Sequence, residues 1–382
     1  MRVLVVHNRY RIEGGEERAV ELHVAALRRA GVAHALLERS SGELSRPEAA
    51  RALLRGGRDE RDVAAAAREL GADVVHVHNM LPLFGPRSLA AARETGARVV
   101  LQLHNLRLFC AIGVAARDGG PCFRCHHRNT LPGLVLNCRG SVPEAAVYAA
   151  ALRRGQPRVL RSAGRFLVPS RWAAGQVALL GLPAARVTTI PHYLPEEAFT
   201  DHSRADEGSY ALLAARLSPE KGADVAIAAA ARSRVPLRIA GEGSARDALR
   251  AQARELGAPV EFLGRLGRAG IAEQLAGAAM LLVPSRYHEF AGYSALEAMA
   301  AGVPVVVSSL GAPAELAGAA RSVPPNDPEA LAERMSELWT DSDLRGREGD
   351  ALLARAVDRF GEERHVARLT RMYRELAGEE PG

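Results

Sequence analysis

Short apolar runs alternate with amphipathic stretches along the whole chain. Each run is five to seven residues long, ends near Gly, Pro, Ser or His, and is followed by a stretch with helical periodicity. This alternation is typical of α/β domains with parallel sheets and helices on both faces. The predicted strands cover residues 2–6, 73–78, 98–104, 165–170, 210–216, 236–241, 260–264, 280–285 and 303–308.

The rhythm of strand and helix breaks once, in residues 188–209, which are rich in Pro, Gly and charged side chains. Such a segment is typical of a linker between domains. We therefore predict two doubly wound, Rossmann-like domains that face each other across a cleft. Their predicted limits are 1–190 for the first domain, 191–208 for the linker, 209–360 for the second domain, and 361–382 for a final helix that packs back on the first domain.

Composition narrows the class of protein. Hydrophobic residues make up 48% of the 382 residues, which is enough for two cores, and no apolar run reaches 18 residues. The opening MRVLVVHNRY turns polar too early for a signal peptide and suits a buried first strand, so we expect a cytoplasmic protein without a transmembrane segment. Aromatic residues are only 4% and do not alternate with basic ones, which disfavours nucleic-acid binding.

Charge is distributed unevenly. Residues 1–195 contain 28 arginines and no lysine against 15 acidic residues, whereas the remainder has 22 basic and 29 acidic residues. The first half therefore suits an anionic acceptor or a peripheral position at a membrane surface. A solvated basic face explains the same excess equally well.

One lysine stands out, because 49 of the 50 basic residues are arginine and Lys221 is the exception. It lies in ARLSPEKGAD, where Arg216 ends a predicted strand and Lys221 precedes a predicted helix. Lysine offers a compact point charge that arginine does not, and two cations beside a tight Ser-Pro turn suit a diphosphate. For Arg216 alone, a charged surface loop is the simpler interpretation.

Two glutamates frame a short apolar helix in SRYHEFAGYSALEAMAAG, residues 285–302. The helix is expected to begin near Gly292 and to end at Gly302, with Glu289 before it and Glu297 inside it. The helix N-terminus would form an anion site, and a carboxylate among apolar neighbours needs hydrogen-bond donors such as sugar hydroxyls. Alternatively, Glu297 lies on the exposed stripe of a surface helix.

These motifs together resemble the retaining GT-B glycosyltransferases of family 4. RLSPEKG, GEG, FLG, PSRYHEFAGYSALEAMAAGVPVV and SSLGAPAEL follow one another in the order of that family, and EGGEERAVELHVAALRRAG resembles its N-terminal glycine-rich loop and helix. The match covers most of the chain and is weakest over residues 106–165. The ordered set is specific, although no single motif is.

The resemblance implies roles for residues of the second domain. Arg216 and Lys221 would neutralise the donor diphosphate, Glu297 would hold the ribose, and Glu289 would contact the transferred sugar. The backbone amides of Phe290, Ala291 and Gly292 would line the pocket for sugar and phosphate.

The resemblance also implies three further site residues. Gly15 would approach the diphosphate from the first domain, His104 would face the reacting sugar, and Glu315 would support the site. A strand-end histidine that caps backbone groups is an equally common interpretation of His104. The sequence departs from the family pattern at Ala291 and at residues 191–193. The resemblance therefore does not determine the identity of the transferred sugar or the details of the hinge between the domains.

The implied reaction is transfer from a nucleotide-diphosphate sugar, with a UDP-sugar favoured, to a hydroxyl of a glycan, lipid-linked or small-molecule acceptor. Cationic side chains and helix amides would stabilise the departing diphosphate, so no metal and no protein nucleophile is expected at this step. A non-catalytic sugar-nucleotide-binding protein, or another GT-B enzyme such as a phosphorylase or an epimerase, remains an alternative.

All four cysteines lie in one expected insert, at about residues 106–140, which directly follows His104. They are Cys110, Cys122, Cys125 and Cys138, and the middle pair forms a Cys-x2-Cys motif. Four thiols in a loop-rich segment predict a structural zinc site, with an iron–sulfur cluster or four free thiols as alternatives.

Overall fold

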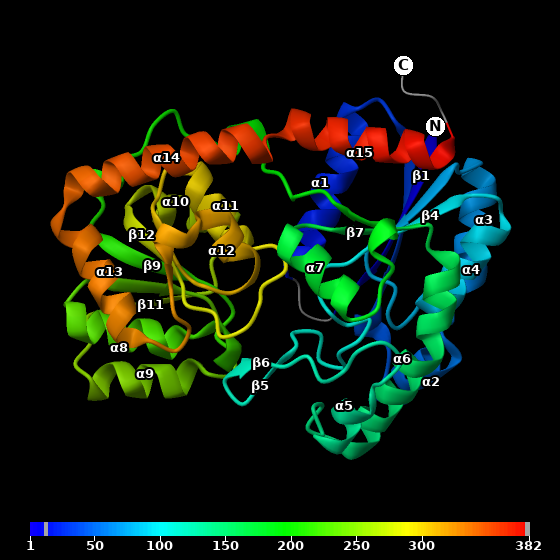
Figure 1. The fold of residues 1–382 in the computed structure, drawn as a ribbon, viewed down its shortest axis with the longest axis horizontal. Coiled ribbons are helices and arrows are strands. Elements are labelled where there is room, and N and C mark those ends of the chain that lie inside the picture. The colour runs from blue at the N-terminus through cyan, green and yellow to red at the C-terminus, as the bar shows by residue number, and fades with distance from the viewer. Residues whose placement is uncertain (11–13, 379–382) are drawn as a thin grey trace. The chain divides into compact units, whose positions relative to one another are not determined.

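The computed structural model of the chain describes residues 1–10 and 14–378 (Figure 1). Glu13 of the predicted glycine-rich loop and residues 379–382 of the predicted final helix therefore lie outside the described residues. The chain forms two compact units, and each contains more than one stretch of sequence. Unit 1 consists of residues 1–115, 123–192 and 363–382, and unit 2 consists of residues 116–122 and 193–362.

Unit 1 contains a six-stranded parallel sheet with the order β2-β1-β3-β4-β7-β8. The central strands β3 and β4 are buried except for Arg98 and consist mostly of β-branched and aliphatic residues, as expected for a sheet covered on both faces. The strands are β1 (Arg2–Arg9), β2 (Ala33–Ser40), β3 (Val74–Val77), β4 (Arg98–Gln102), β7 (Arg165–Val168) and β8 (Val187–Thr189).

The helices of unit 1 follow the strands in the expected alternation. The last of them, α15, follows all of unit 2 in the sequence, yet its Tyr373 bonds to His76 at the end of β3 and to His23 of α1. These helices are α1 (Gly15–Arg29), α2 (Arg46–Arg55), α3 (Glu60–Leu70), α4 (Gly85–Glu94), α5 (Leu131–Val135), α6 (Val142–Ser162), α7 (Arg171–Leu179) and α15 (Glu362–Ala377).

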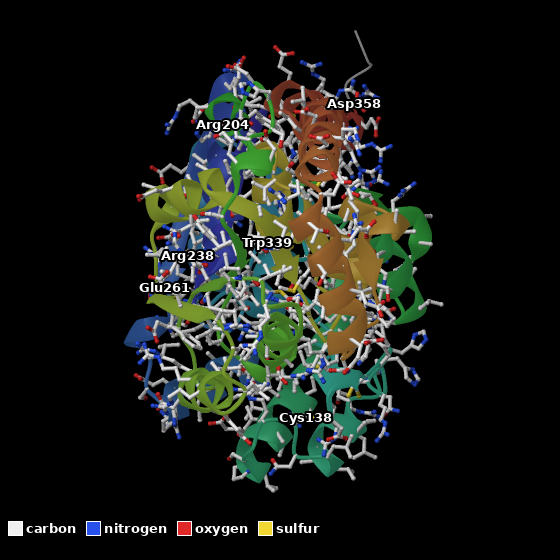
Figure 2. The ribbon with its side chains drawn as sticks, turned by 90° about the vertical axis from the view of Figure 1, so that its left-hand side faces the viewer. Cys138, Arg204, Arg238, Glu261, Trp339 and Asp358 are labelled. Atoms are coloured by element: carbon white, nitrogen blue, oxygen red, sulfur yellow. The ribbon has the colours of Figure 1, made fainter. Side chains whose placement is uncertain are left out.

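Unit 2 contains a second six-stranded parallel sheet, with the order β11-β10-β9-β12-β13-β14. Its edge carries a cross-strand ion pair, in which Arg238 Nε donates to Glu261 Oε2 at 2.9 Å (Figure 2). The unit also holds a small antiparallel hairpin of β5 (Ala116–Arg117) and β6 (Gly120–Pro121). The strands of the sheet are β9 (Tyr210–Ala214), β10 (Leu237–Ala240), β11 (Val260–Gly264), β12 (Ala278–Val283), β13 (Val305–Ser308) and β14 (Ser322–Val323).

Helices cover both faces of the sheet of unit 2 (Figure 1), and a hydrophobic core lies on each face. Side chains of α8, α9 and α13 build the core on one face, and those of α10, α11, α12 and α14 build the core on the other. The helices are α8 (Ala223–Ser233), α9 (Arg246–Glu255), α10 (Arg268–Ala276), α11 (Tyr293–Ala300), α12 (Gly311–Ala317), α13 (Pro328–Thr340) and α14 (Ser342–Phe360).

The predicted α/β class and the two doubly wound, Rossmann-like domains are confirmed, and all nine predicted strands are present. The sequence pattern missed β2, β8 and β14, which are partly exposed edge strands of the two six-stranded sheets. In β2, AHALLERS, most side chains are half-buried, so no continuous apolar run marks the strand.

Candidate active site

The strand order of each sheet identifies where a ligand would bind. In a doubly wound sheet, ligands occupy the crevice at the carboxyl ends of the two strands where the strand order reverses. In unit 2 these strands are β9 and β12, and in unit 1 they are β1 and β3. The loops after β9 and β12 contain six of the ten predicted catalytic and donor-binding residues, namely Arg216, Lys221, Glu289, Phe290, Ala291 and Gly292.

A buried ion pair lies at the reversal point of unit 2. Lys221 Nζ is 2.8 Å from Glu289 Oε1, and the two side chains are only 16% and 11% exposed. Burial opposes the charge of Lys221, but the Glu289 carboxylate and the Tyr287 hydroxyl together outweigh this effect and raise the pKa of the lysine. Burial likewise opposes the charge of Glu289, but the ammonium group lowers the pKa of the carboxyl, so both partners are charged at neutral pH.

Two residues that sequence reasoning missed complete this pair. The Ser285 hydroxyl donates a short hydrogen bond to Glu289 Oε1, and Lys221 Nζ lies 5.2 Å from the centre of the Tyr287 ring. Burial, followed by the charge of Glu289, raises the pKa of the Tyr287 hydroxyl. Both residues lie in the sequence SRYHEF. A hydroxyl and an aromatic ring close to Glu289 in the sequence are the signals that could have identified them as site residues.

Arg286 ties the two loops of this site together. Its backbone N–H donates to the Glu220 carbonyl at 2.8 Å, and its guanidinium pairs with both oxygens of the Asp224 carboxylate. Bidentate arginine–carboxylate pairs fix orientation as well as distance. The loop that carries Lys221 is therefore held against the loop that carries Glu289.

Gly222 allows these loops to approach so closely. It has φ +70°, and a Cβ at this position would lie 2.0 Å from the Pro284 carbonyl oxygen. Any other residue would push the Lys221 turn away from β12, because both the left-handed conformation and the space exclude a side chain. Gly222 also stands at the N-cap of α8, so Lys221 lies directly before a helix N-terminus.

The second predicted helix N-terminus is also present. α11 begins at Tyr293, with Gly292 at its N-cap in the left-handed conformation (φ +71°), as the sequence predicts. Phe290 and Gly292 are buried, and Ala291 is half-buried. The positive ends of the α8 and α11 dipoles thus follow β9 and β12 on the same edge of the sheet.

The remaining predicted residues of unit 2 lie on the surrounding elements. Arg216 is largely exposed and pairs with Glu220 at 3.3 Å. Glu297 is half-buried in α11, between the buried Leu296 and Ala298, so it is not on a fully exposed stripe. Glu315 lies half-buried in α12, and its backbone carbonyl accepts a hydrogen bond from Arg355 Nη2 at 3.0 Å.

Gly15 and His104 belong to unit 1. Gly15 is exposed and is the first residue of α1, the helix that follows β1 in the sequence. His104 follows β4, is half-buried, and stacks on His192 with ring centres 5.9 Å apart. Burial, with a further contribution from His192, keeps the pKa of His104 well below its usual value, so the ring is neutral at physiological pH.

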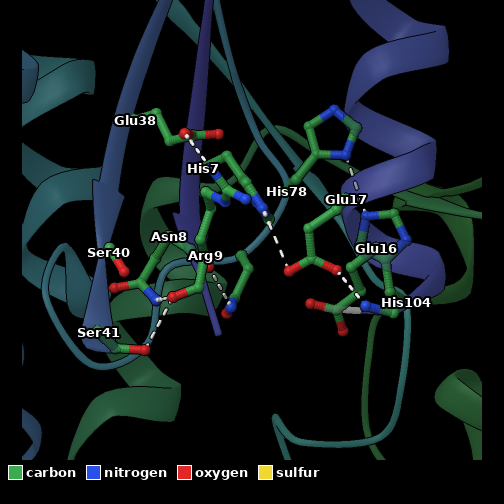
Figure 3. A network of polar contacts seen from close by, with 12 residues as sticks. His7, Asn8, Arg9, Glu16, Glu17, Glu38, Ser40, Ser41, His78 and His104 are labelled. Atoms are coloured by element: carbon green, nitrogen blue, oxygen red, sulfur yellow. Dashed lines mark hydrogen bonds and ion pairs between the residues drawn. The ribbon is translucent and has the colours of Figure 1, made fainter. Parts of the chain in front are cut away.

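His104 ends a line of buried side chains that the sequence analysis did not identify. Its Nε2 is 3.0 Å from Nδ1 of His78, and Figure 3 shows the two rings joined in this way. We call this line the histidine chain. Its members in order are His104, His78, His23, Tyr373, His76 and Gln102, and successive contacts measure 3.0, 2.5, 2.8, 2.5 and 3.0 Å.

A group of acidic side chains lies near the start of α1 (Figure 3). Burial raises the pKa of Glu16 to about 7, although Arg107 opposes this shift. Glu17 Oε1 is 4.0 Å from His7 Nε2, and burial followed by the charge of Arg9 lowers the pKa of His7 to about 4. Neither ring nitrogen of His7 has a hydrogen-bond partner among the described residues.

The cysteines do not all fall in one unit. Cys110, Cys125 and Cys138 belong to unit 1, and Cys122 belongs to the short segment 116–122 that groups with unit 2. Burial raises the pKa of Cys110, and Cys138 adds to the shift. Gly133 of α5 lies next to both Cys125 and Cys138. Cys138 N donates to the Gly133 carbonyl at 3.1 Å, and a Cβ on Gly133 would lie 3.6 Å from Cys125 Sγ.

Two doubly wound units with polar loops at the reversal points of their sheets define the GT-B class of fold. A glycosyl transferase 4-like domain model matches residues 2–192, and a model described as glycosyl transferases group 1 matches residues 196–351. The chain belongs to this glycosyltransferase family and is an enzyme of that kind. No helix among the described residues is long and apolar enough to cross a membrane.

Several characterised proteins are similar to this chain. A phosphatidyl-myo-inositol mannosyltransferase of Mycobacterium tuberculosis is 30% identical over 276 residues, which are 68% of this chain and 68% of that protein. An exopolysaccharide phosphotransferase of Streptomyces coelicolor is 37% identical over 177 residues, which are 43% of this chain but only 18% of that longer protein. HepE of Anabaena, solved in complex with UDP and glucose, has the same fold, with a TM-score of 0.68 and 18% identity over 98% of this chain and 100% of that chain.

Proposed function

We propose that this glycosyltransferase moves a sugar from a nucleotide-diphosphate donor, with a UDP-sugar favoured, to an acceptor hydroxyl, with retention of the anomeric configuration. The observation that carries the proposal is the buried pair of Lys221 and Glu289 at the reversal point of unit 2. The pair puts a cation for phosphate and a carboxylate for hydroxyls beside two helix N-termini. The UDP in the Anabaena neighbour supports the choice of base.

In the proposed reaction, breaking the bond between sugar and phosphate builds negative charge on the diphosphate. Lys221, Arg216 and the N-termini of α8 and α11 stabilise that charge as preorganised electrostatics. Glu289 accepts hydrogen bonds from the transferred sugar, Glu297 from the ribose, and His104 contacts the reacting sugar. The acceptor attacks from the side of the leaving group, and the departing phosphate takes the acceptor proton.

We also propose that the acceptor is anionic or lipid-linked and that the enzyme works at a membrane surface. The arginine excess of residues 1–195 supports this, as do three largely exposed apolar residues, Leu131, Val135 and Val142. Sedimentation with vesicles tests the proposal. Binding to vesicles that contain anionic lipid, with release by salt, is expected, whereas equal recovery with neutral vesicles would contradict it.

We propose, finally, that the cysteines bind a structural zinc ion. Thiolates are the donors that zinc prefers, and the contacts of Gly133 with Cys125 and Cys138 support a local site. Bound zinc would supply folding energy to a segment with little core of its own.

The main test is a panel of UDP-, GDP- and ADP-sugars, with release of the nucleotide diphosphate measured on the full chain. Glu297→Gln is expected to reduce turnover about 100- to 1,000-fold. Glu261→Gln is the matched control, because Glu261 is an exposed glutamate at the sheet edge of the same unit. The configuration of the product, read by NMR, tests retention.

The alternatives predict other outcomes of the same test. A non-catalytic sugar-nucleotide-binding protein would bind a donor without consuming it. An epimerase would return a changed nucleotide sugar without releasing the diphosphate. Turnover by Glu297→Gln equal to that of the wild type would contradict the assignment of the donor site.

A further inference from the structure

Five members of the histidine chain are buried side chains of unit 1. His23, His76, His78, Gln102 and Tyr373 are between 0% and 6% exposed. Four elements contribute to the chain, because His23 lies in α1, Tyr373 in α15, and the others in or directly after β3 and β4. Most polar groups at such depth are hydrogen-bonded, because a buried donor or acceptor without a partner costs free energy.

The residue at one end of the histidine chain determines the direction of its hydrogen bonds. Gln102 Oε1 can only accept, so His76 Nε2 must carry the proton that bonds to it. A neutral imidazole has one N–H and one lone pair, so His76 Nδ1 accepts from the Tyr373 hydroxyl. The Tyr373 oxygen then accepts from Nε2–H of His23.

The same argument continues to the other end. His23 Nδ1 carries a lone pair and accepts from Nε2–H of His78, and His78 Nδ1 accepts from Nε2–H of His104. In every hydrogen bond of the histidine chain, the donor is therefore on the His104 side and the acceptor is on the Gln102 side. Burial keeps the pKa values of the histidines well below 6.5, which agrees with one proton on each ring.

A metal site is the other chemistry that three clustered histidines suggest. One ring nitrogen from each of His23, His76 and His78 lies within 4.8 Å of the others, and this is the one set of three or more candidate ligands in the described part of the chain. All six ring nitrogens of these residues already take part in the hydrogen bonds of the chain. The hydrogen-bonded chain accounts for every nitrogen without a metal ion.

We propose that the histidine chain fixes the tautomer of His104, with the proton on Nε2, so that Nδ1 offers a lone pair to a hydroxyl of the transferred sugar. Tyr373 of α15 is the positioning residue that joins the two halves of the chain. Within the described residues nothing bonds to Nδ1 of His104, and this atom is not one of the fully buried ones. The assignment of the His104 tautomer depends only on the hydrogen bonds of the histidine chain. The role of His104 toward a sugar depends on the proposed function.

Removing the Tyr373 hydroxyl provides the sharpest perturbation, because Tyr373→Phe deletes a single heavy atom from the histidine chain. In the native direction, the variant would leave a buried N–H on His23 without an acceptor. If the bonds reversed, the variant would leave only a lone pair on His23 Nε2 without a donor. Buried N–H groups without an acceptor are rarer in proteins than buried acceptors without a donor. The variant should therefore reverse the bonds of His23, His78 and His104, and place the proton of His104 on Nδ1.

NMR of the full, ligand-free chain with ¹⁵N-labelled histidine reads this change directly, because protonated and unprotonated ring nitrogens have distinct shifts. We expect Nε2–H for His104 in the wild type and Nδ1–H in Tyr373→Phe. Tyr148→Phe, which removes a hydroxyl elsewhere in unit 1, should keep the wild-type pattern. If Tyr373→Phe does not fold, Gln102→Met removes the terminal acceptor instead, and Gln102→Glu should restore the wild-type tautomer.

Kinetics provide the second measurement. Tyr373→Phe is expected to lower kcat at least about ten-fold with an unchanged KM for the donor, because a histidine in the wrong tautomer fails in the reaction step. A wild-type His104 with the proton on Nδ1, or a tautomer that Tyr373→Phe leaves unchanged, would overturn the proposal. Failure of the proposed function is distinguishable, since it would abolish sugar transfer by the wild type and leave the NMR result intact.

Discussion

Acidification should unfold unit 1 selectively, because this unit buries an unusual number of neutral histidines. Burial is the largest cause in every case, and it lowers the pKa of each of these histidines. It is lowered to about 4 in His7 and His365 and to about 3 in His76 and His192. A histidine whose folded pKa is depressed contributes stability above its unfolded pKa of 6.5, and this stability is lost as the pH falls below that value. The seven histidines are His7, His23, His76, His78, His104, His192 and His365.

The expected loss follows from proton linkage. Between pH 7 and pH 5.5 the unfolded chain gains about 0.7 proton per histidine, which costs the folded state about 1.3 kcal/mol each. Seven such residues amount to about 9 kcal/mol. Glu16 acts in the opposite sense, because its raised pKa of about 7 lets the folded state take up a proton and recover about 1.6 kcal/mol. The net loss of about 7 kcal/mol is comparable to the whole stability of a typical domain.

The two tryptophans of the chain allow each unit to be followed separately. Trp172 lies in α7 of unit 1 and Trp339 in α13 of unit 2. Urea unfolding would be followed by fluorescence at pH 7, 6.2 and 5.5, in Trp339→Phe for unit 1 and in Trp172→Phe for unit 2. We expect the unit 1 midpoint to fall steeply, with uptake of about five protons on unfolding near pH 5.5. The unit 2 midpoint should move far less.

Equal midpoints at pH 7 and pH 5.5 in the Trp339→Phe background would refute the reasoning. That result would mean that the histidines are protonated in the folded state or remain buried in the unfolded one. His365→Asn provides an internal check. It removes one of the seven groups and should lower the proton uptake by about one.

Three further predictions concern unit 2 and the cysteines. Lys221→Ala should abolish transfer and also destabilise unit 2 by about 3–5 kcal/mol, because it leaves the buried Glu289 carboxylate without its partner. The Trp339 transition measures this loss, and Lys221→Met combined with Glu289→Gln should regain most of it without regaining activity. Donor turnover should survive EDTA, because the expected phosphate ligands are side-chain cations and helix amides, and a strict requirement for added magnesium or manganese would contradict this. Elemental analysis should find about one zinc per chain, with loss of the metal in Cys122→Ser, whereas metal-free wild-type protein with four titratable thiols would exclude the zinc site.

The sequence predicted those parts of the molecule that depend on local pattern. The buried strands and the helix that begins after Gly292 could be read from apolar runs and glycine positions, and composition singled out Lys221, which the structure places in a buried ion pair. The pairing of Lys221 with Glu289 could not, because 68 residues separate them and the approach depends on Gly222 fitting against Pro284.

The histidine chain was missed for a similar reason. Its one local signal is the DVVHVH strand, where His76 and His78 share a face, beside Gln102 and His104 at the same spacing on the neighbouring strand. The residue that joins the chain, Tyr373, comes from a helix almost 300 residues further along. Propensity and periodicity contain no information about contacts at that separation.

The place of α15 in the sequence has a consequence for the order in which the protein is made. The ribosome completes residues 1–192 first, yet Tyr373 and the rest of α15 emerge only after the whole of unit 2. Until then, His23 and His76 lack the hydroxyl that joins them in the mature unit. Domains of a nascent chain generally fold in the order of their synthesis. Here the N-terminal unit is the last to be finished, and unit 2 is the first for which all parts are available.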